Sequence, residues 1–241
     1  MDFIVKFYQF FEAGFKYIFE HWDRVSPRFI EHLQISGVAL LIALVIALPL
    51  GFLISRVRWL AAPVLGVLGV LYTIPSLAFL AFFVPIYGLG FTTVVIVLIL
   101  YSQTMLVRNV ALGFTGIDRS ILEAARGMGM SGWQVFWQVE LPLAIPIIVA
   151  GMRIATLSII SIATVGAFVG AGGLGKLLTV DNPRLNAAGV ISVIFIAITA
   201  DLVYRAIEAF TGGNRGKRPS QARPKKIVAT AGVGAQGTVE A

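Results

Sequence analysis

The chain has 241 residues, of which 58% are hydrophobic and only 13% are charged. Its mean hydropathy of +0.88 is too high for a soluble domain to cover with so few charges, so lipid is the expected solvent. The net charge of +7 does not indicate a nucleic-acid partner, because 7 of the 19 Lys and Arg lie between Arg205 and Lys226, as is usual on the cytoplasmic side of a membrane protein. The absence of cysteine excludes disulfides and thiolate metal sites.

The N-terminal segment, residues 1–32, has an amphipathic pattern. Phe7, Phe11 and Phe15 recur at helical spacing, whereas Lys16 and other polar residues fall largely on the opposite face. This pattern predicts a helix that lies in the membrane interface rather than crossing it. It would serve as an anchor or as a contact with a partner.

Five apolar segments follow, each close to the roughly 20 residues that cross a bilayer. They predict an all-α, polytopic membrane protein whose transmembrane domain covers residues 33–210. A Gly-, Pro-, Lys- and Arg-rich tail, residues 211–241, is expected to be disordered. The predicted spans are 34–55, 61–84, 91–107, 143–169 and 187–207.

Charge placement gives an expected orientation. Five spans put the termini on opposite sides, and a cytoplasmic tail places Arg56, Arg58, Arg108 and Arg126 inside as well. We therefore expect the N-terminus outside and the C-terminus in the cytoplasm, although the basic residues of the N-terminal segment oppose this rule.

The second span contains a predicted break at Pro75. Proline, with Thr73 and Ser76 beside it, should kink or unwind the helix, and the freed backbone groups then need a partner or a water-lined cavity. Tyr72, Thr73, Pro75 and Ser76 are therefore our candidates for lining a pathway.

Three charged residues lie within or near the last two spans. Asp201 and Arg205 are four residues apart, which predicts a local ion pair. Arg153 is expected to snorkel or to pair with Asp201 or Glu140. We assign these residues a structural role rather than contact with a substrate.

The sequence Gly170–Lys176, GAGGLGK, has the spacing of a phosphate-binding loop, but the rest of that motif is missing. A phosphate-binding loop continues with Ser or Thr and follows a strand, whereas here Leu177 follows and a membrane helix precedes. The glycines instead predict a tight reversal and a close approach of helices.

A polar segment, residues 118–142, interrupts the apolar pattern between the third and fourth spans. Asp118 and Ser120 are suited to starting a short helix. Glycines end this helix, and an aromatic face follows that membrane or protein must cover. The residues alone allow either a helix pair with a small-residue contact face or an ordinary interfacial loop. The glycines are Gly127, Gly129 and Gly132, and the aromatic residues are Trp133, Phe136 and Trp137.

This segment resembles the EAA loop of the inner-membrane permease subunits of binding-protein-dependent ABC importers. The family pattern, E-A-A, three residues, G, nine residues, I-x-L-P, is matched by Glu123-Ala124-Ala125, Gly129 and Leu141-Pro142, with Val139 in place of Ile. Over residues 33–210 the chain is similar to methionine-importer-like permeases with five spans.

The resemblance implies partners and roles. Two permease subunits would form the pathway above two cytoplasmic ATPase subunits, and an extracytoplasmic binding protein would deliver substrate. Residues 123–129 would form a coupling helix that enters a groove on the ATPase. Its contacts would be Glu123, Ala124, Ala125, Gly127 and Gly129, supported by Trp133, Phe136, Trp137, Leu141 and Pro142.

Three shorter stretches, 73–78, 126–130 and 170–175, are similar to the osmoprotectant branch, which handles glycine betaine, carnitine and choline. We therefore expect a permease subunit of an ATP-driven importer in a bacterial inner membrane, with no catalytic residue, cofactor or metal of its own. The alternatives are a permease for another small solute, such as methionine or taurine, and a non-transporting scaffold. An intramembrane enzyme is disfavoured because the only histidines, His21 and His32, precede the first predicted span.

Overall fold

The structure, a computed structural model, describes residues 2–212, and its regular elements are all helical, as predicted. The predicted disordered tail lies almost entirely outside these residues. In chain order the elements are α1 (Asp2–Glu20), α2 (Trp22–Arg56), α3 (Arg58–Thr73), α4 (Ser76–Tyr87), α5 (Phe91–Thr115), α6 (Arg119–Gly127), α7 (Gly132–Val135), the π-helical turn Phe136–Glu140, α8 (Leu141–Val165), the 3-10 turn Gly166–Val169, α9 (Gly175–Leu178) and α10 (Pro183–Gly212).

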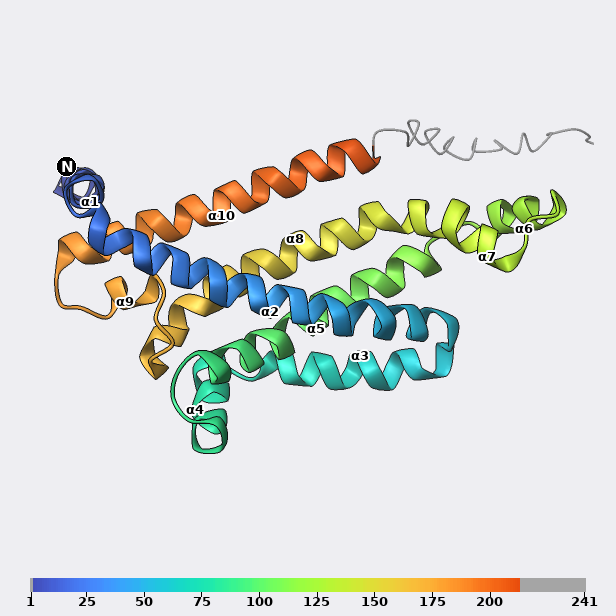
Figure 1. Ribbon diagram of the computed structural model, residues 1–241, viewed down its shortest axis with the longest axis horizontal. Helices are drawn as coiled ribbons and strands as arrows, with labels where there is room; N and C mark the ends of the chain where they lie inside the picture. The colour runs from blue at the N-terminus through green and yellow to red at the C-terminus, as the bar shows by residue number, and fades with distance from the viewer. Residues whose placement is uncertain (1, 213–241) are drawn as a thin grey trace, which may run out of the picture.

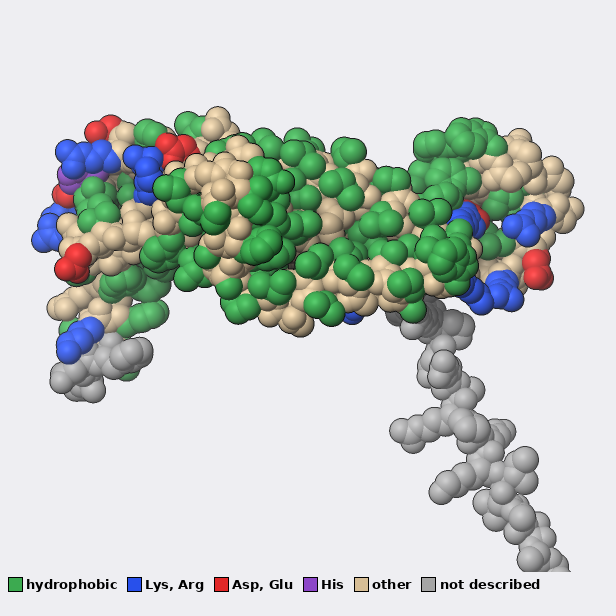
Figure 2. All heavy atoms as spheres, turned by 90° about the horizontal axis from the view of Figure 1, so that it is seen from below, with side chains coloured by type: hydrophobic (Ala, Val, Ile, Leu, Met, Phe, Trp, Pro, Cys, Tyr) green, Lys and Arg blue, Asp and Glu red, His purple; other side chains and the backbone are tan. Residues whose placement is uncertain are grey.

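The long helices are arranged as a membrane bundle. Among the described residues, four helical stretches are long and apolar enough to cross a membrane, and the bent pair α3–α4, which corresponds to the second predicted span, brings the total to five if it is one span. Figure 1 shows α2, α5, α8 and α10 along the longest axis, with α6 and α7 at one end and α1 and α9 at the other. Apolar side chains cover the middle of the molecule and charged side chains gather at its two ends (Figure 2), as a bilayer requires.

Helix α5 is the centre of the bundle. It packs most extensively against α2 and α8, and it also contacts α3 and α4. Its buried residues include Val97, Leu98, Leu106 and Val107. The helix continues to Thr115, beyond the predicted end of the third span at residue 107, because Arg108 remains exposed on the outer face and does not interrupt the buried stripe.

The N-terminal segment is divided differently from the prediction. Helix α1 ends at Glu20, and α2 already begins at Trp22, so residues 22–32 are the first turns of the first span. The break falls at His21, whose φ of −130° and ψ of 41° are not helical. Val25 and His32 are buried, which places this stretch in the bundle, whereas α1 crosses the direction of α10 and packs against it (Figure 1).

Candidate coupling site and the broken span

Helix α6 begins at Asp118, which is its N-cap. The Asp118 carboxylate accepts hydrogen bonds from the Ser120 backbone N–H and hydroxyl, both at 2.9 Å. These bonds, the backbone one first, hold the pKa of Asp118 below its usual value. Because the cap is Asp118 and not Ser120, Glu123 does not close a capping box, and its carboxylate is exposed at the surface.

The end of α6 explains the glycine of the EAA-like pattern. The Met130 N–H bonds the Ala125 carbonyl at 3.3 Å, and the Gly129 N–H bonds the Arg126 carbonyl at 2.9 Å. This is the Schellman motif, which needs a left-handed residue at the position after the C-cap. Gly129 has φ +83°, so glycine is favoured there for its backbone conformation.

The two alanines of the pattern have different environments. Ala125 is 2% exposed and lies where α6 packs against α7 and the π-helical turn. Glu123, Ala124 and Gly127 are exposed, and a Cβ added to Gly127 would meet no atom within 4 Å. With Met128, these residues are at spacings that share one face of a helix. The free face of α6 is therefore Glu123, Ala124, Gly127 and Met128, without Ala125.

Helix α7 joins α6 directly to the fourth span. A capping box starts it, with the Ser131 N–H bonding Gln134 Oε1 at 2.8 Å and the Gln134 N–H bonding Ser131 Oγ at 3.3 Å. Helical structure then runs without interruption from Gly132 to Val169, although the sequence suggested that the span starts at residue 143.

A π-helical turn lies inside this continuous helix, and Pro142 accounts for it. The Leu141 N–H bonds the Phe136 carbonyl, five residues back. Pro142 has no N–H, and its ring would clash with the carbonyl four residues earlier in an α-helix. A single wide turn before the proline relieves that clash. Leu141 is half-buried and Pro142 is exposed.

Phe136 attaches the 118–142 segment to the bundle. Its ring lies 5.4 Å from Phe52 of α2 and 6.1 Å from Phe114 of α5, measured between ring centroids. Trp133 and Trp137 contact each other but remain 72% and 49% exposed. Of the three aromatic residues predicted to support the segment, only Phe136 packs into the bundle, and the exposed tryptophans are typical of a membrane interface.

The sequence analysis did not identify a second attachment, between Arg56 and Glu140. Glu140 is only 4% exposed and forms an ion pair with Arg56 from the end of α2. The Arg56 guanidinium also lies over the Phe52 ring, 4.8 Å from its centroid. Glu140 is therefore not the partner of Arg153, as one alternative had suggested. An Arg closing one span and a Glu opening another were visible in the sequence, but nothing there paired them.

The predicted break in the second span is confirmed. Helices α3 and α4 meet at an angle of 95°, and the Tyr101 hydroxyl of α5 donates to the Ile74 carbonyl freed at the break. The Tyr72 ring packs edge-on against Tyr101, at 5.7 Å. Among the pathway candidates, Tyr72, Thr73 and Pro75 are exposed and Ser76 is half-buried.

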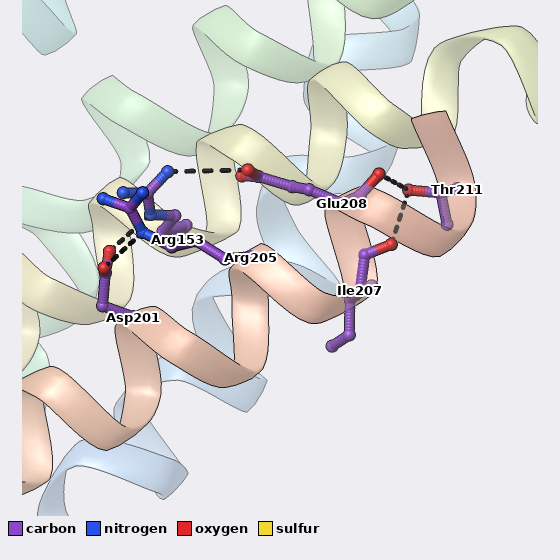
Figure 3. Close-up of polar contacts among 6 residues, drawn as sticks. All are labelled: Arg153, Asp201, Arg205, Ile207, Glu208 and Thr211. Carbon is purple, nitrogen blue, oxygen red and sulfur yellow. Dashed lines mark hydrogen bonds and ion pairs between the residues drawn. The ribbon is translucent and has the colours of Figure 1, made fainter. Parts of the chain in front are cut away.

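A charged cluster joins α8 to α10 (Figure 3). Arg153 Nε donates to Asp201 Oδ1 at 2.6 Å, and Arg153 Nη1 lies 3.5 Å from Glu208 Oε2. Arg205 Nε donates to the other oxygen of Asp201 at 2.7 Å. The predicted pair of Asp201 with Arg205 is confirmed, and of the three alternatives for Arg153 the structure shows the pair with Asp201; Glu208 joins the cluster.

The glycine-rich loop after α8 holds an anion, but it is one from the chain itself. The Gly173 N–H donates to Glu31 Oε2 at 2.8 Å. A Cβ on Gly172 would lie 2.5 Å from that same oxygen, and a Cβ on Gly175 would lie 2.0 Å from the Thr164 carbonyl oxygen of α8. The loop makes the predicted tight reversal, with helices in close approach. The place of a phosphate is taken by a carboxylate of α2.

Comparisons with known proteins agree with this geometry. Residues 39–211 match the family described as "Binding-protein-dependent transport system inner membrane component". The chain is similar to the glycine betaine/carnitine/choline transport system permease protein OpuCB of Bacillus subtilis (strain 168), with 38% identity over 74% of this chain and 84% of that one. It is also similar to the osmoprotectant import permease protein OsmW of Salmonella typhimurium, with 34% identity over 80% and 94% of the two chains.

A solved structure shares the fold. It is an inward-facing conformation of the MetNI methionine ABC transporter, with a TM-score of 0.70 and 22% identity, covering 78% of this chain and 95% of that one. The family match covers most of the chain, and the two relatives are more than 30% identical to it. The helical, multi-pass architecture of the described residues agrees with both. The chain belongs to the family of binding-protein-dependent transport system inner membrane components, and it is a translocation subunit rather than an enzyme.

Proposed function

We propose that the chain is the permease subunit of an ATP-driven importer for compatible solutes such as glycine betaine, choline or carnitine. The substrate class is supported by the named activities of the relatives. The observation that carries the coupling role is the free face of α6: it is exposed, it lies at the far end of the molecule (Figure 1), and a short turn joins α6 to the continuous helix Gly132–Val169 that contains the fourth span. Small residues on that face leave room for another protein's surface.

The partners follow from this proposal. A cytoplasmic ATPase receives α6 in a groove, with Glu123 and Ala124 at the contact. A second permease subunit, identical or homologous, completes the pathway, and an extracytoplasmic binding protein delivers the solute. The end with α6 is then cytoplasmic, so that five spans place the N-terminus outside and the C-terminus inside, in a bacterial inner membrane.

Motion of the ATPase passes from α6 into the bundle through three connections. The first is the continuous helix from Gly132 to Val169. The second is the Arg56–Glu140 ion pair to α2, and the third is the Phe136 ring between Phe52 and Phe114. Trp133, Trp137, Leu141 and Pro142 support this joint at the membrane surface.

The α3–α4 break is the proposed lining of the pathway. Non-helical backbone at membrane depth is tolerated where protein buries it or where it lines a water-filled cavity. Tyr72, Thr73 and Pro75 are exposed in the single chain, with Ser76 beside them. Aromatic faces attract quaternary ammonium groups, which suits Tyr72 to a betaine-like solute.

The decisive test uses Gly127. Alanine fits there without a clash and should favour the helix by about 0.5–1 kcal/mol. We therefore expect Gly127→Ala to fold normally. It should nevertheless lose uptake, because the added methyl group occupies the room that the small residues leave for the surface of the ATPase. The assay is ATP-driven uptake of radiolabelled glycine betaine into vesicles that hold the ATPase, with the binding protein added outside. Gly132→Ala, also in open space but off the α6 face, is the control and should retain uptake.

Other outcomes contradict specific parts of the proposal. Full uptake with Gly127→Ala would remove α6 as the docking face. Uptake of methionine or taurine in place of betaine would change the substrate class. Membrane insertion without any ATP-driven uptake in the complete wild-type system would indicate a scaffold.

A further inference from the structure

The attachment of α10 depends on α8. Helix α10 packs against α8, α9 and α1, and Figure 1 shows it at the edge of the bundle. Its interface with α8 is otherwise mostly apolar, and apolar contact by itself sets helix register weakly. The polar contacts between α8 and α10 therefore set the register of these two helices.

Those contacts form a row that spans two turns. Asp201, Tyr204 and Glu208 lie at spacings that share one face of α10. Arg153 bonds the carboxylates of Asp201 and Glu208. Thr156, one turn further along α8, donates its hydroxyl to the Tyr204 hydroxyl oxygen at 3.0 Å. Figure 3 shows Asp201 and Glu208 on either side of Arg153. A slide of one helical turn, about 5.4 Å, would break every one of these bonds.

The cluster of Arg153, Asp201 and Glu208 lies at a depth in the membrane where charged groups need partners within the protein. Arg153 lies about 18 Å along α8 from Val165, the end opposite to α6, at 1.5 Å per residue. In a hydrocarbon core of about 30 Å this is inside the membrane. Charges at such depth are paired within the protein and are rarely without function. The side chains of Arg153, Asp201 and Glu208 are only 23–26% exposed.

We propose that Arg153 and Asp201 are positioning residues that lock α10 to α8, so that the two helices move as one body when α6 is displaced. This inference rests on the proposed function for the origin of that motion. Helix α8 continues from α7, next to α6, without interruption. The lock, with the neighbouring Thr156–Tyr204 bond, is what extends this movement to the last span.

The first test is substitution with a matched control. Arg153→Met removes both bonds from Arg153 to α10 while keeping an unbranched apolar side chain, and it leaves the Thr156–Tyr204 bond in place. Arg205→Met also removes a bond to Asp201, but one within α10. We expect Arg153→Met to lower solute transported per ATP hydrolysed by about tenfold, within the range carried by packed coupling networks, with ATPase binding unchanged. Arg205→Met should leave the ratio unchanged. Equal ratios for Arg153→Met and wild type would overturn the proposal.

The second test ties the helices covalently and separates the lock from a merely structural role. The chain has no cysteine, so Thr156→Cys and Tyr204→Cys, whose parent side chains touch, can be joined specifically by a short bis-maleimide. The cross-linked double-cysteine protein that keeps Arg153 should still transport solute. The cross-linked double-cysteine protein that also carries Arg153→Met should regain transport. If joining stops transport, α8 and α10 must slide past each other and the proposal is wrong.

A spectroscopic readout keeps this result distinct from failure of the proposed function. Spin labels on α8 and α10 should keep the same separation when the ATPase binds ATP, while labels on α8 and on the second permease subunit change theirs. A change in the α8–α10 distance would contradict the lock even if glycine betaine is transported. An unchanged α8–α10 distance in a complex that moves but transports no betaine would leave the lock standing and refute only the substrate.

Discussion

At the end of the molecule that carries α6, a Cβ added to Gly127 or Gly132 would meet no atom within 4 Å. At the opposite end, a Cβ added to Gly172 or Gly175 would lie within 2.5 Å of an oxygen of the chain itself. Both ends are glycine-rich in sequence, yet the space beside Gly127 and Gly132 is open. Glu31 and Thr164 fill the space beside Gly172 and Gly175, although a Cβ on Gly170 of the same loop would meet no atom within 4 Å. The difference indicates that the outer loop is completed by its own fold, whereas the α6 face is available to another protein.

Gly175→Ala tests the packing of the outer loop and should have the most severe effect. The added Cβ would overlap the Thr164 carbonyl, which is backbone and cannot rotate away. We expect a loss of about 3 kcal/mol or more in stability, seen as a lower melting temperature and less protein in the membrane. Gly132→Ala, in open space, is the control. A normal melting temperature for Gly175→Ala would show that the loop is not closely packed.

Arg56→Met tests the attachment of the α6 end. It leaves the buried Glu140 carboxylate without its partner. Breaking a fully buried pair costs about 3–5 kcal/mol, and we expect about 2–3 kcal/mol here because the Arg56 side chain is 44% exposed. Thermal unfolding measures this effect, and the double variant Arg56→Met/Glu140→Met should recover part of it. No recovery would mean that Arg56 acts through its contact with Phe52.

Gly129→Ala separates backbone conformation from partner contact. The left-handed φ of +83° costs an L-residue about 1–2 kcal/mol, although a Cβ there has free space. We expect a small drop in melting temperature together with weaker ATPase binding. Gly129→Asn tolerates the left-handed region better and should retain more of both. Equal behaviour of the Ala and Asn variants would contradict a conformational role.

The smallest expected effect is the pH dependence of the α6 cap. Because its bonds to Ser120 lower the pKa of Asp118, the cap stabilises α6 fully above the ordinary pKa of 3.8. That contribution is lost as the pH falls through the lowered value. The melting-temperature difference between wild type and Asp118→Ala should therefore shrink in acid. Asp118→Asn keeps an acceptor that does not titrate, and its difference from Asp118→Ala should stay constant.

Much of the architecture was predictable because it depends on local pattern. Apolar runs located the spans, and Pro75 located the break, since proline removes a helical hydrogen bond wherever it stands. The ion pairs of Asp201 were predictable because Arg205 is one turn away and Arg153 lies in the preceding span. Glu140 was assigned an uncertain partner because its true one, Arg56, lies 84 positions away. Ala124 is exposed and Ala125 is buried because α7 folds back over only one face of α6. No local spacing in the sequence specifies which face that is.

Membrane location, helical class and the family resemblance of the polar segment could all be predicted from the amino-acid sequence. Composition, hydrophobic run length and fixed motif spacing act along the chain and need no knowledge of what packs against what. Three features required the folded structure: Phe136 and the Arg56–Glu140 pair attach the α6 end, Glu31 fills the outer loop, and α10 is bonded to α8. These are contacts between residues far apart in the chain, and their partners are selected by packing and by the cost of leaving a charge unpaired.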